Sequence, residues 1–223
     1  ISWDVDSAFG SLSLSHGDFL KTQTSATSYY EGYGWYPGAS DGFMLNPGDG
    51  LLMNLENPDV LTYPEGSGLA SSFVVTEDSD QIKNSLWNVD YHNYEFNGTI
   101  TSKVLIEGVP SGSKGDLLGL FVDGECRGVA EAMTNPFNDE YVFLLMAYSN
   151  KAQGEEMTLS YYDAQKDIVY ENIQKITFED NMVKGDAIHS YVVSYDSDAA
   201  PTNYKLKAAY PNPFNPSTNI DFS

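Results

Sequence analysis

The sequence contains little cysteine and few basic residues. Cys126 is the only cysteine among 223 residues, so no internal disulfide can form. The chain has 11 lysines and arginines against 32 aspartates and glutamates, and its formal net charge is −21. A field of that sign repels nucleic-acid phosphates and anionic membranes, so neither is an expected partner. The acidity is typical of a protein that stays soluble outside the cell, or of one that binds calcium or a cationic partner.

Long apolar segments and catalytic motifs are also missing. No hydrophobic run approaches the roughly 20 residues that a membrane-spanning helix needs, so no membrane insertion is expected. The histidines, His16, His92 and His189, lie far apart. No Gly-x-Ser-x-Gly, His-Glu-x-x-His or phosphate-binding glycine loop occurs. Cys126 lies just before an apolar strand, which favours a packed thiol over a nucleophile. We expect a protein that is not an enzyme, with calcium as the one candidate cofactor.

Tyrosine, glycine and proline are abundant, and they indicate the fold class. The 16 tyrosines, 19 glycines and 10 prolines favour short strands separated by turns. We predict an all-β fold with two consecutive modules. Residues 1–70 form a small, tyrosine-rich and hairpin-rich module, and residues 71–195 form an immunoglobulin-like or jelly-roll-like β-sandwich. A linker at 196–207 follows, and then an extended strand within 208–223.

In the first module the clearest pattern is a β-hairpin. Residues 22–30 form its first arm, Glu31-Gly32 its turn, and residues 33–36 its second arm. The other expected elements are strands at 1–5, 51–55 (buried) and 60–63, and a helical turn at 6–9 or 17–21.

The second module has strand patterns at intervals of roughly 8–12 residues, which is typical of a sandwich. The stretch 141–148 is the most apolar, and we expect it to be buried on both faces. The expected strands are a pair within 94–106, then 117–122, 126–130, 141–148, 157–163, 168–170 and 176–178.

The C-terminal stretch combines closely spaced prolines with a strand pattern. The prolines exclude a helix, and Thr218, Ile220 and Phe222 then alternate with polar residues. The stretch resembles the opening of the C-terminal sorting domain of proteins exported by the type IX secretion system of Bacteroidetes-like bacteria. This resemblance implies an extracellular or cell-surface location. It is carried by Tyr210, Pro211, Asn212, Pro213, Phe214, Asn215 and Pro216, followed by Ile220 and Phe222 in the strand.

Both modules also resemble domains that accompany such sorting domains. In the first, Tyr33-Gly34-Trp35, Pro47-Gly48-Asp49-Gly50-Leu51 and Leu61-Thr62-Tyr63-Pro64 match a small β module of secreted proteins from the same bacteria. In the second, residues 116–130, which include Glu-Cys-Arg-Gly-Val-Ala, match a recurrent β-sandwich that precedes type IX sorting domains. The resemblance implies architecture and location rather than a biochemical activity.

Two kinds of candidate site follow from the residues. The hairpin carries Tyr29, Tyr33, Trp35 and Tyr36, and exposed rings of this kind stack on sugars or bind proteins. The alternative is that these rings belong to the core of the module. The second candidate is calcium, for which two close acidic pairs are available, Asp4 with Asp6 and Asp123 with Glu125. Neither pair matches the twelve-residue calcium loop.

Three functions fit these observations. The first is a non-catalytic binding, adhesion or structural module of an exported bacterial protein, whose partner is an extracellular glycan or protein. The second is a subunit of an extracellular fibre that binds copies of itself, because the strands at 1–5 and 218–222 could complete a neighbour's sheet. The third is an accessory, carbohydrate-binding part of a larger secreted hydrolase.

Overall fold

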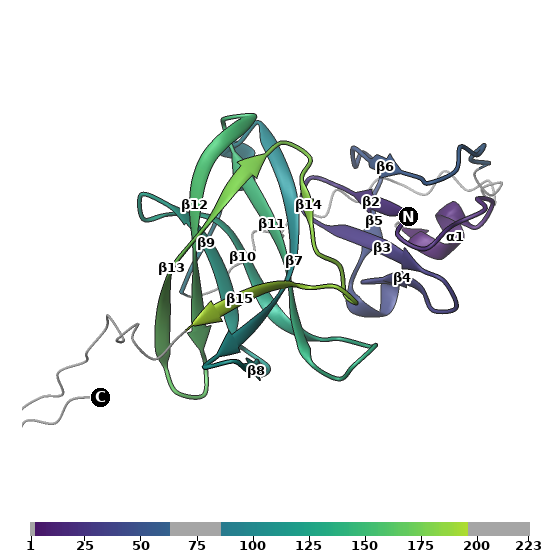
Figure 1. Ribbon diagram of the computed structural model, residues 1–223. Coiled ribbons are helices and arrows are strands. Elements are labelled where there is room, and N and C mark those ends of the chain that lie inside the picture. Colours follow the sequence, from purple (N-terminus) through teal and green to yellow (C-terminus); the bar gives the residue numbers. More distant parts are fainter. Residues whose placement is uncertain (1–2, 63–85, 196–223) are drawn as a thin grey trace, which may run out of the picture.

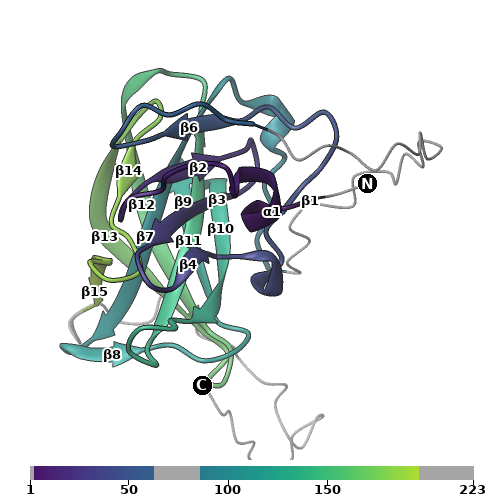
Figure 2. The same ribbon diagram turned by 90° about the vertical axis from the view of Figure 1, so that its right-hand side faces the viewer.

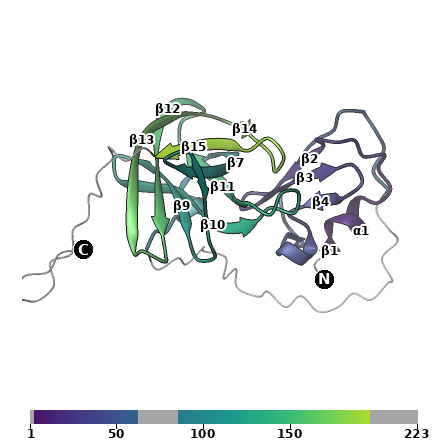
Figure 3. The ribbon, with the colours of Figure 1, turned by 60° about the horizontal axis from the view of Figure 1, so that its bottom comes forward.

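The computed structural model describes residues 3–62 and 86–195 (Figure 1). Strands make up 51% of the structure and helices 7%, so the predicted all-β class is confirmed. Figures 1 and 3 show two bodies side by side, a smaller one built from β1–β6 and a larger one built from β7–β15. The predicted linker at 196–207 and the proline-rich stretch after it lie outside the described residues.

The smaller body, called the first module here, contains a four-stranded antiparallel sheet in the order β4-β3-β2-β6 and a separate two-stranded pair, β1-β5. The expected hairpin is confirmed by β3 and β4, which pair through Tyr29 and Trp35. Its elements are β1 (Trp3–Asp4), α1 (Val5–Phe9), β2 (Phe19–Lys21), β3 (Ala26–Tyr30), β4 (Gly34–Tyr36), η1 (Ala39–Asp41), β5 (Met44–Leu45) and β6 (Leu52–Asn54).

The helical turn expected at residues 6–9 forms as α1, and its sequence explains its start. Asp4 stands at the N-cap, where its side chain accepts a 2.7 Å hydrogen bond from the backbone N–H of Ser7. Val5 and Phe9 are buried on the inner face of the helix. They pack with Leu20 and Trp35 in the core of the first module, so the short helix is held by burial rather than by its own propensity.

The larger body is a curled nine-stranded sheet that forms a sandwich-like fold, with the strand order β13-β12-β9-β10-β11-β7-β14 and with β8 and β15 also on β7. Its elements are η2 (Tyr91–Asn93), β7 (Phe96–Ile106), β8 (Val109–Ser111), β9 (Leu117–Val122), β10 (Glu125–Thr134), β11 (Tyr141–Ser149), β12 (Gln153–Asp163), β13 (Ile168–Glu179), β14 (Val183–Lys184) and β15 (Tyr191–Tyr195).

Strand β10 connects the two layers of this fold. Residues 125–131 pair with β9, whereas residues 132–134 pair with β11, so the strand passes from one layer to the other. The core between the layers is apolar and contains Ile100, Leu118, Phe143 and Leu159, each no more than 1% exposed. Side-chain hydrogen bonds link β13, at one end of the strand order, to β15. The Gln174 side chain of β13 accepts a hydrogen bond from the N–H of Ser194 and donates one to the carbonyl of Val192, both at 3.4 Å.

Several predicted elements require correction. The stretch 51–55, predicted as a buried strand, yields the short β6, and Leu52 there is 41% exposed because β6 is an edge strand. The strands expected at 168–170 and 176–178 form one strand, β13. The pair expected within 94–106 is the single strand β7. No strand begins at residues 60–62, the described part of the stretch predicted at 60–63.

No helix in the described parts of the chain is long and apolar enough to cross a membrane.

Candidate functional site at the junction of the two modules

The two modules meet along a junction made of buried polar contacts, in which strands β2–β4 lie against the larger body (Figure 2). The Tyr30 hydroxyl accepts a 2.8 Å hydrogen bond from the N–H of Ala187, and the Tyr36 hydroxyl donates to the carbonyl of Thr134 at 2.9 Å. From the other side, the Tyr148 hydroxyl donates to the carbonyl of Gln23 at 2.9 Å. Each bond joins residues about a hundred or more positions apart in the sequence, so the junction is a purely tertiary feature.

Lys21 is a charged side chain that is buried in the junction. It is 4% exposed, and its Nζ donates to both the backbone and the side-chain oxygens of Asn97. Burial lowers the pKa of the Lys21 ammonium, and Asp180 partly opposes this shift. Lys21 is also the only lysine or arginine before Lys83. A lone lysine in an acidic, strand-forming stretch was the signal in the sequence that could have located this contact.

The apolar part of the junction surrounds Tyr30 and Tyr36, which are each 3% exposed and pack with Val142 and Ala187. Phe137, from the loop between β10 and β11, contacts Tyr30 with ring centroids 4.7 Å apart. Phe137 also contacts Tyr33 at 5.0 Å. Rings from both modules therefore form one cluster, and this arrangement fixes the modules relative to each other.

Two hollows border the junction. A small cavity of about 30 Å³ lies between Thr27 of the first module and Thr99 of the second. The Thr27 hydroxyl is buried and has no hydrogen-bond partner among the described residues, and the cavity is large enough for a water molecule. A wider, open groove of about 530 Å³ follows β10 from Val129 to Thr134, with Asp41 and Lys114 among the residues that line it.

The aromatic residues predicted as a ligand-binding strip do not share one exposed face. Trp35 is 3% exposed in the core of the first module, where it contacts Tyr29 and Phe9. Tyr36 is buried in the junction. Tyr33 is 51% exposed. The expected exposed strip is therefore corrected to Tyr33 with a half-buried Tyr29, because the two faces of a β-hairpin point in opposite directions.

Three loops meet around Tyr33 and form the exposed surface of the junction. They are the β3–β4 turn, the β10–β11 loop and the β14–β15 loop. The last two are joined by a 2.5 Å hydrogen bond from Asn135 Nδ2 to the carbonyl of Ala187. Their exposed side chains include Tyr33 at 51%, Phe137 at 36% and Ile188 at 44%. We call this set, with Glu31 and Asp139 from the same loops, the junction surface.

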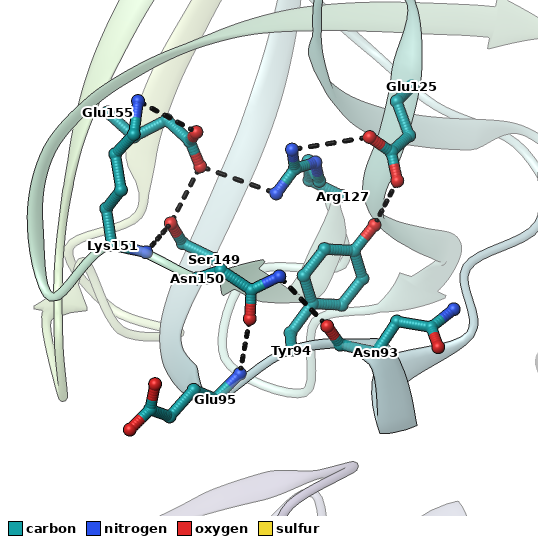
Figure 4. A network of polar contacts seen from close by, with 9 residues as sticks. All are labelled: Asn93, Tyr94, Glu95, Glu125, Arg127, Ser149, Asn150, Lys151 and Glu155. Atoms are coloured by element: carbon teal, nitrogen blue, oxygen red, sulfur yellow. Dashed lines mark hydrogen bonds and ion pairs between the residues drawn. The ribbon is translucent and has the colours of Figure 1, made fainter.

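A second polar cluster surrounds Arg127 (Figure 4). The guanidinium pairs with Glu125 at 3.3 Å and with Glu155 at 3.4 Å. It also lies over the ring of Tyr94, 4.8 Å from the centroid. Glu155 is 8% exposed and accepts a 2.7 Å hydrogen bond from Ser149. Arg127 therefore ties the β9–β10 hairpin to the ends of β11 and β12.

The electrostatics of this cluster favour a structural role. Burial, together with the hydrogen bond to Glu125, raises the pKa of Tyr94 to about 12. Burial also raises the pKa of the Cys126 thiol, which donates to the carbonyl of Gly128. Both groups are therefore neutral at pH 7, and Cys126 is held as a thiol rather than as the thiolate that a nucleophile requires.

Other residues of the 116–130 motif have structural roles as well. Asp116 is 1% exposed, and its carboxylate accepts hydrogen bonds from the Tyr161 hydroxyl at 2.6 Å and from the N–H of Ala164 at 2.8 Å. A Cβ added at Gly128 would lie 2.1 Å from the carbonyl oxygen of Met146. Within this motif, Gly128 allows the close approach of two backbones, and Asp116 supplies a buried carboxylate that accepts hydrogen bonds.

The two acidic pairs predicted to bind calcium lie in different modules. Asp4 caps α1, and its hydrogen bonds to Ser7 lower its pKa. Asp6 follows in the same helix. Asp123 lies in the β9–β10 turn with φ +51°, and Glu125 pairs with Arg127. Within residues 3–62 and 86–195 no group of three or more His, Cys, Asp or Glu side chains is placed to hold a metal ion. Calcium binding stays a prediction.

The fold and the junction define an all-β protein in which two modules share buried contacts. No protein-family model, no curated protein and no solved structure matches this chain.

Proposed function

We propose that this chain is a non-catalytic binding, adhesion or structural unit of an exported bacterial protein, acting outside the cell or at its surface. The observation that carries the proposal is the junction. Four buried side chains, Tyr30, Tyr36, Tyr148 and Lys21, bond across it. Two modules held in this way present loops from both of them as one surface, and binding residues commonly lie on loops that a rigid scaffold positions.

Two features of the sequence support the extracellular location. The net charge of −21 favours solubility and suits a protein that does not bind nucleic acid or anionic lipid. The proline-rich stretch that begins at Tyr210 resembles the start of a type IX sorting domain. Detection of the tagged gene product on intact cells and in the medium tests the location. A product confined to the cytoplasm would contradict the proposal.

The binding role is tested with a glycan array and with extracellular-matrix proteins, each with and without calcium. We expect the Tyr33→Ala variant to lose most of the binding, because Tyr33 is the most exposed ring of the junction surface. Val109→Ala is the matched control, since Val109 is 63% exposed on β8 of the larger body. The same array tests the carbohydrate-binding role in a larger hydrolase, for which the expected ligand is a polysaccharide.

A second candidate function is a subunit of an extracellular fibre. It is favoured by β6, which ends the four-stranded sheet of the first module and exposes Leu52. An exposed edge strand is a template for strand addition, and residues 218–222 have the alternating pattern of an added strand. Electron micrographs of the purified chain test this directly. Filaments are the expected result, and separate particles at all concentrations would contradict it.

A further inference from the structure

We propose that the lysine-bearing segment after β15 of one copy docks on the junction surface of a second copy, so that the molecules associate head to tail. The segment is residues 199–220, and its cationic groups are Lys205 and Lys207. This inference requires neither export nor strand addition, and it assigns both a surface and the chemistry of its partner.

The negative charge of the first module favours a cationic partner. Within residues 3–62 the only lysine or arginine is Lys21, which is buried in the junction. The first module therefore presents carboxylates to solvent without any exposed ammonium or guanidinium group. The exposed carboxylates are Asp6, Glu31, Asp41, Asp49, Glu56 and Asp59. Such a surface attracts a cationic partner and repels the rest of this acidic chain.

The exposed rings of the junction surface favour binding of the cationic segment there rather than elsewhere on the acidic module. Tyr33 and Phe137 are half-exposed and in contact with each other. They lie in loops that also carry the exposed carboxylates Glu31 and Asp139. Aromatic rings beside carboxylates can bind a segment in which lysines alternate with apolar side chains. The rings contact the methylene chains and the ammonium groups of the lysines, and the carboxylates pair with those ammonium groups. Lys103, of the neighbouring β7, is already paired with Glu140 at 3.2 Å.

The chain itself supplies such a segment. Residues 199–220 contain two lysines and no aspartate or glutamate, whereas the whole chain has a net charge of −21. The order around the lysines is Tyr204-Lys205-Leu206-Lys207-Ala208, so apolar and cationic side chains alternate. In an extended segment these alternate between two faces, and the pair of lysines can face the carboxylates together.

The geometry favours a second copy as the partner. Strand β15 (Tyr191–Tyr195) points away from the first module, and it ends on the side of the larger body remote from that module in both Figure 1 and Figure 3. The junction surface, in contrast, lies where the two modules meet. A contact between two different surfaces is heterologous and leads to open chains or closed rings of molecules.

The test is sedimentation velocity of the full chain over a range of concentrations, at low and high salt. We expect concentration-dependent association that weakens at high salt, since exposed charges are screened. Lys205→Gln with Lys207→Gln should weaken the association about tenfold, and Tyr33→Ser should have an effect of similar size.

The matched control changes two lysines outside the proposed segment. Lys151→Gln with Lys175→Gln removes the same charge from exposed lysines of the larger body, which are 68% and 59% exposed. It should leave the association unchanged. A monomer at every concentration overturns the proposal, as does association that the Lys205 and Lys207 changes leave intact or that both lysine pairs weaken equally. Association abolished by Ile220→Asp but not by the lysine changes indicates strand addition, and it also overturns this proposal.

Discussion

The Tyr30 hydroxyl of the first module accepts a hydrogen bond from the N–H of Ala187 in the second module, at 2.8 Å, and both residues are buried. Tyr30→Phe leaves this backbone N–H without its acceptor, and a buried unpaired donor costs about 1–3 kcal/mol. We expect the free energy of unfolding in urea to fall by that amount. Tyr33→Phe is the matched control and should change it little, since the Tyr33 side chain is half-exposed. Equal losses of unfolding free energy in the two variants would contradict a stabilising hydrogen bond between Tyr30 and Ala187 across the junction.

Alkaline pH should destabilise the protein through its buried tyrosines. Burial raises the pKa of Tyr148 and of Tyr36 above the ordinary value of 10.0. A tyrosine with a raised pKa stabilises the fold fully below about pH 10, and this contribution is lost as the pH rises toward the folded-state pKa. The free energy of unfolding should therefore fall above pH 10, by about 1.4 kcal/mol per pH unit for each such tyrosine.

The Tyr148→Phe variant isolates one of these groups. It should be less stable than the parent at pH 8, because the hydrogen bond to Gln23 is lost. Its stability should then fall less steeply above pH 10. Urea unfolding at a series of pH values, with ionisation followed by absorbance near 295 nm, measures both effects. An unchanged slope would mean that Tyr148 ionises freely in the folded protein.

Arg127 should matter more to stability than its exposed ion pair suggests. Arg127→Met removes the guanidinium from the buried carboxylate of Glu155, which keeps only the 68% exposed Lys151, at 3.6 Å, as a cationic partner. Breaking a buried pair costs about 3–5 kcal/mol, and because Lys151 remains we expect a loss near the lower end, about 3 kcal/mol. The control is Glu125→Gln, which removes the 62% exposed partner and should cost less than about 1 kcal/mol. Urea unfolding of the two variants gives the comparison, and similar losses would show that Glu155 is not desolvated.

Gly128 should not tolerate a side chain. In Gly128→Ala the new Cβ would meet the carbonyl of Met146 at 2.1 Å, so β10 and β11 must separate, at a cost of about 3 kcal/mol. Gly50→Ala is the control, because a Cβ there meets nothing within 4 Å. Thermal unfolding monitored by circular dichroism should show a large fall in melting temperature for the first variant only. A well-folded Gly128→Ala protein would contradict the close approach of these strands.

The sequence predicted the elements whose signals are local. The hairpin of β3 and β4, the helical turn α1 and the apolar strand β11 all follow from residue spacing within short windows. The sequence predicts two strands within β13 because Glu171 and Lys175 interrupt its apolar pattern. In the structure one strand pairs with β12 on both sides of a register shift that lies between these two residues. The apolar stretch 51–55 predicts a buried strand, but β6 lies at the edge of its sheet.

The candidate site could not be predicted in the same way. The partners at the junction, such as Tyr30 with Ala187 and Tyr148 with Gln23, are separated by 157 and 125 positions. No pattern within one element encodes such a pairing. The sequence showed that Trp35 and Tyr36 are rings in a hairpin, but not which face of that hairpin would be covered by the second module.

The central claim is that the two modules form one structural unit, and differential scanning calorimetry tests it most directly. We predict a single transition whose calorimetric enthalpy equals the van't Hoff enthalpy, as in a two-state protein. Tyr30→Phe should lower the temperature of that whole transition. Two separate transitions, with only one of them shifted by Tyr30→Phe, would contradict the claim.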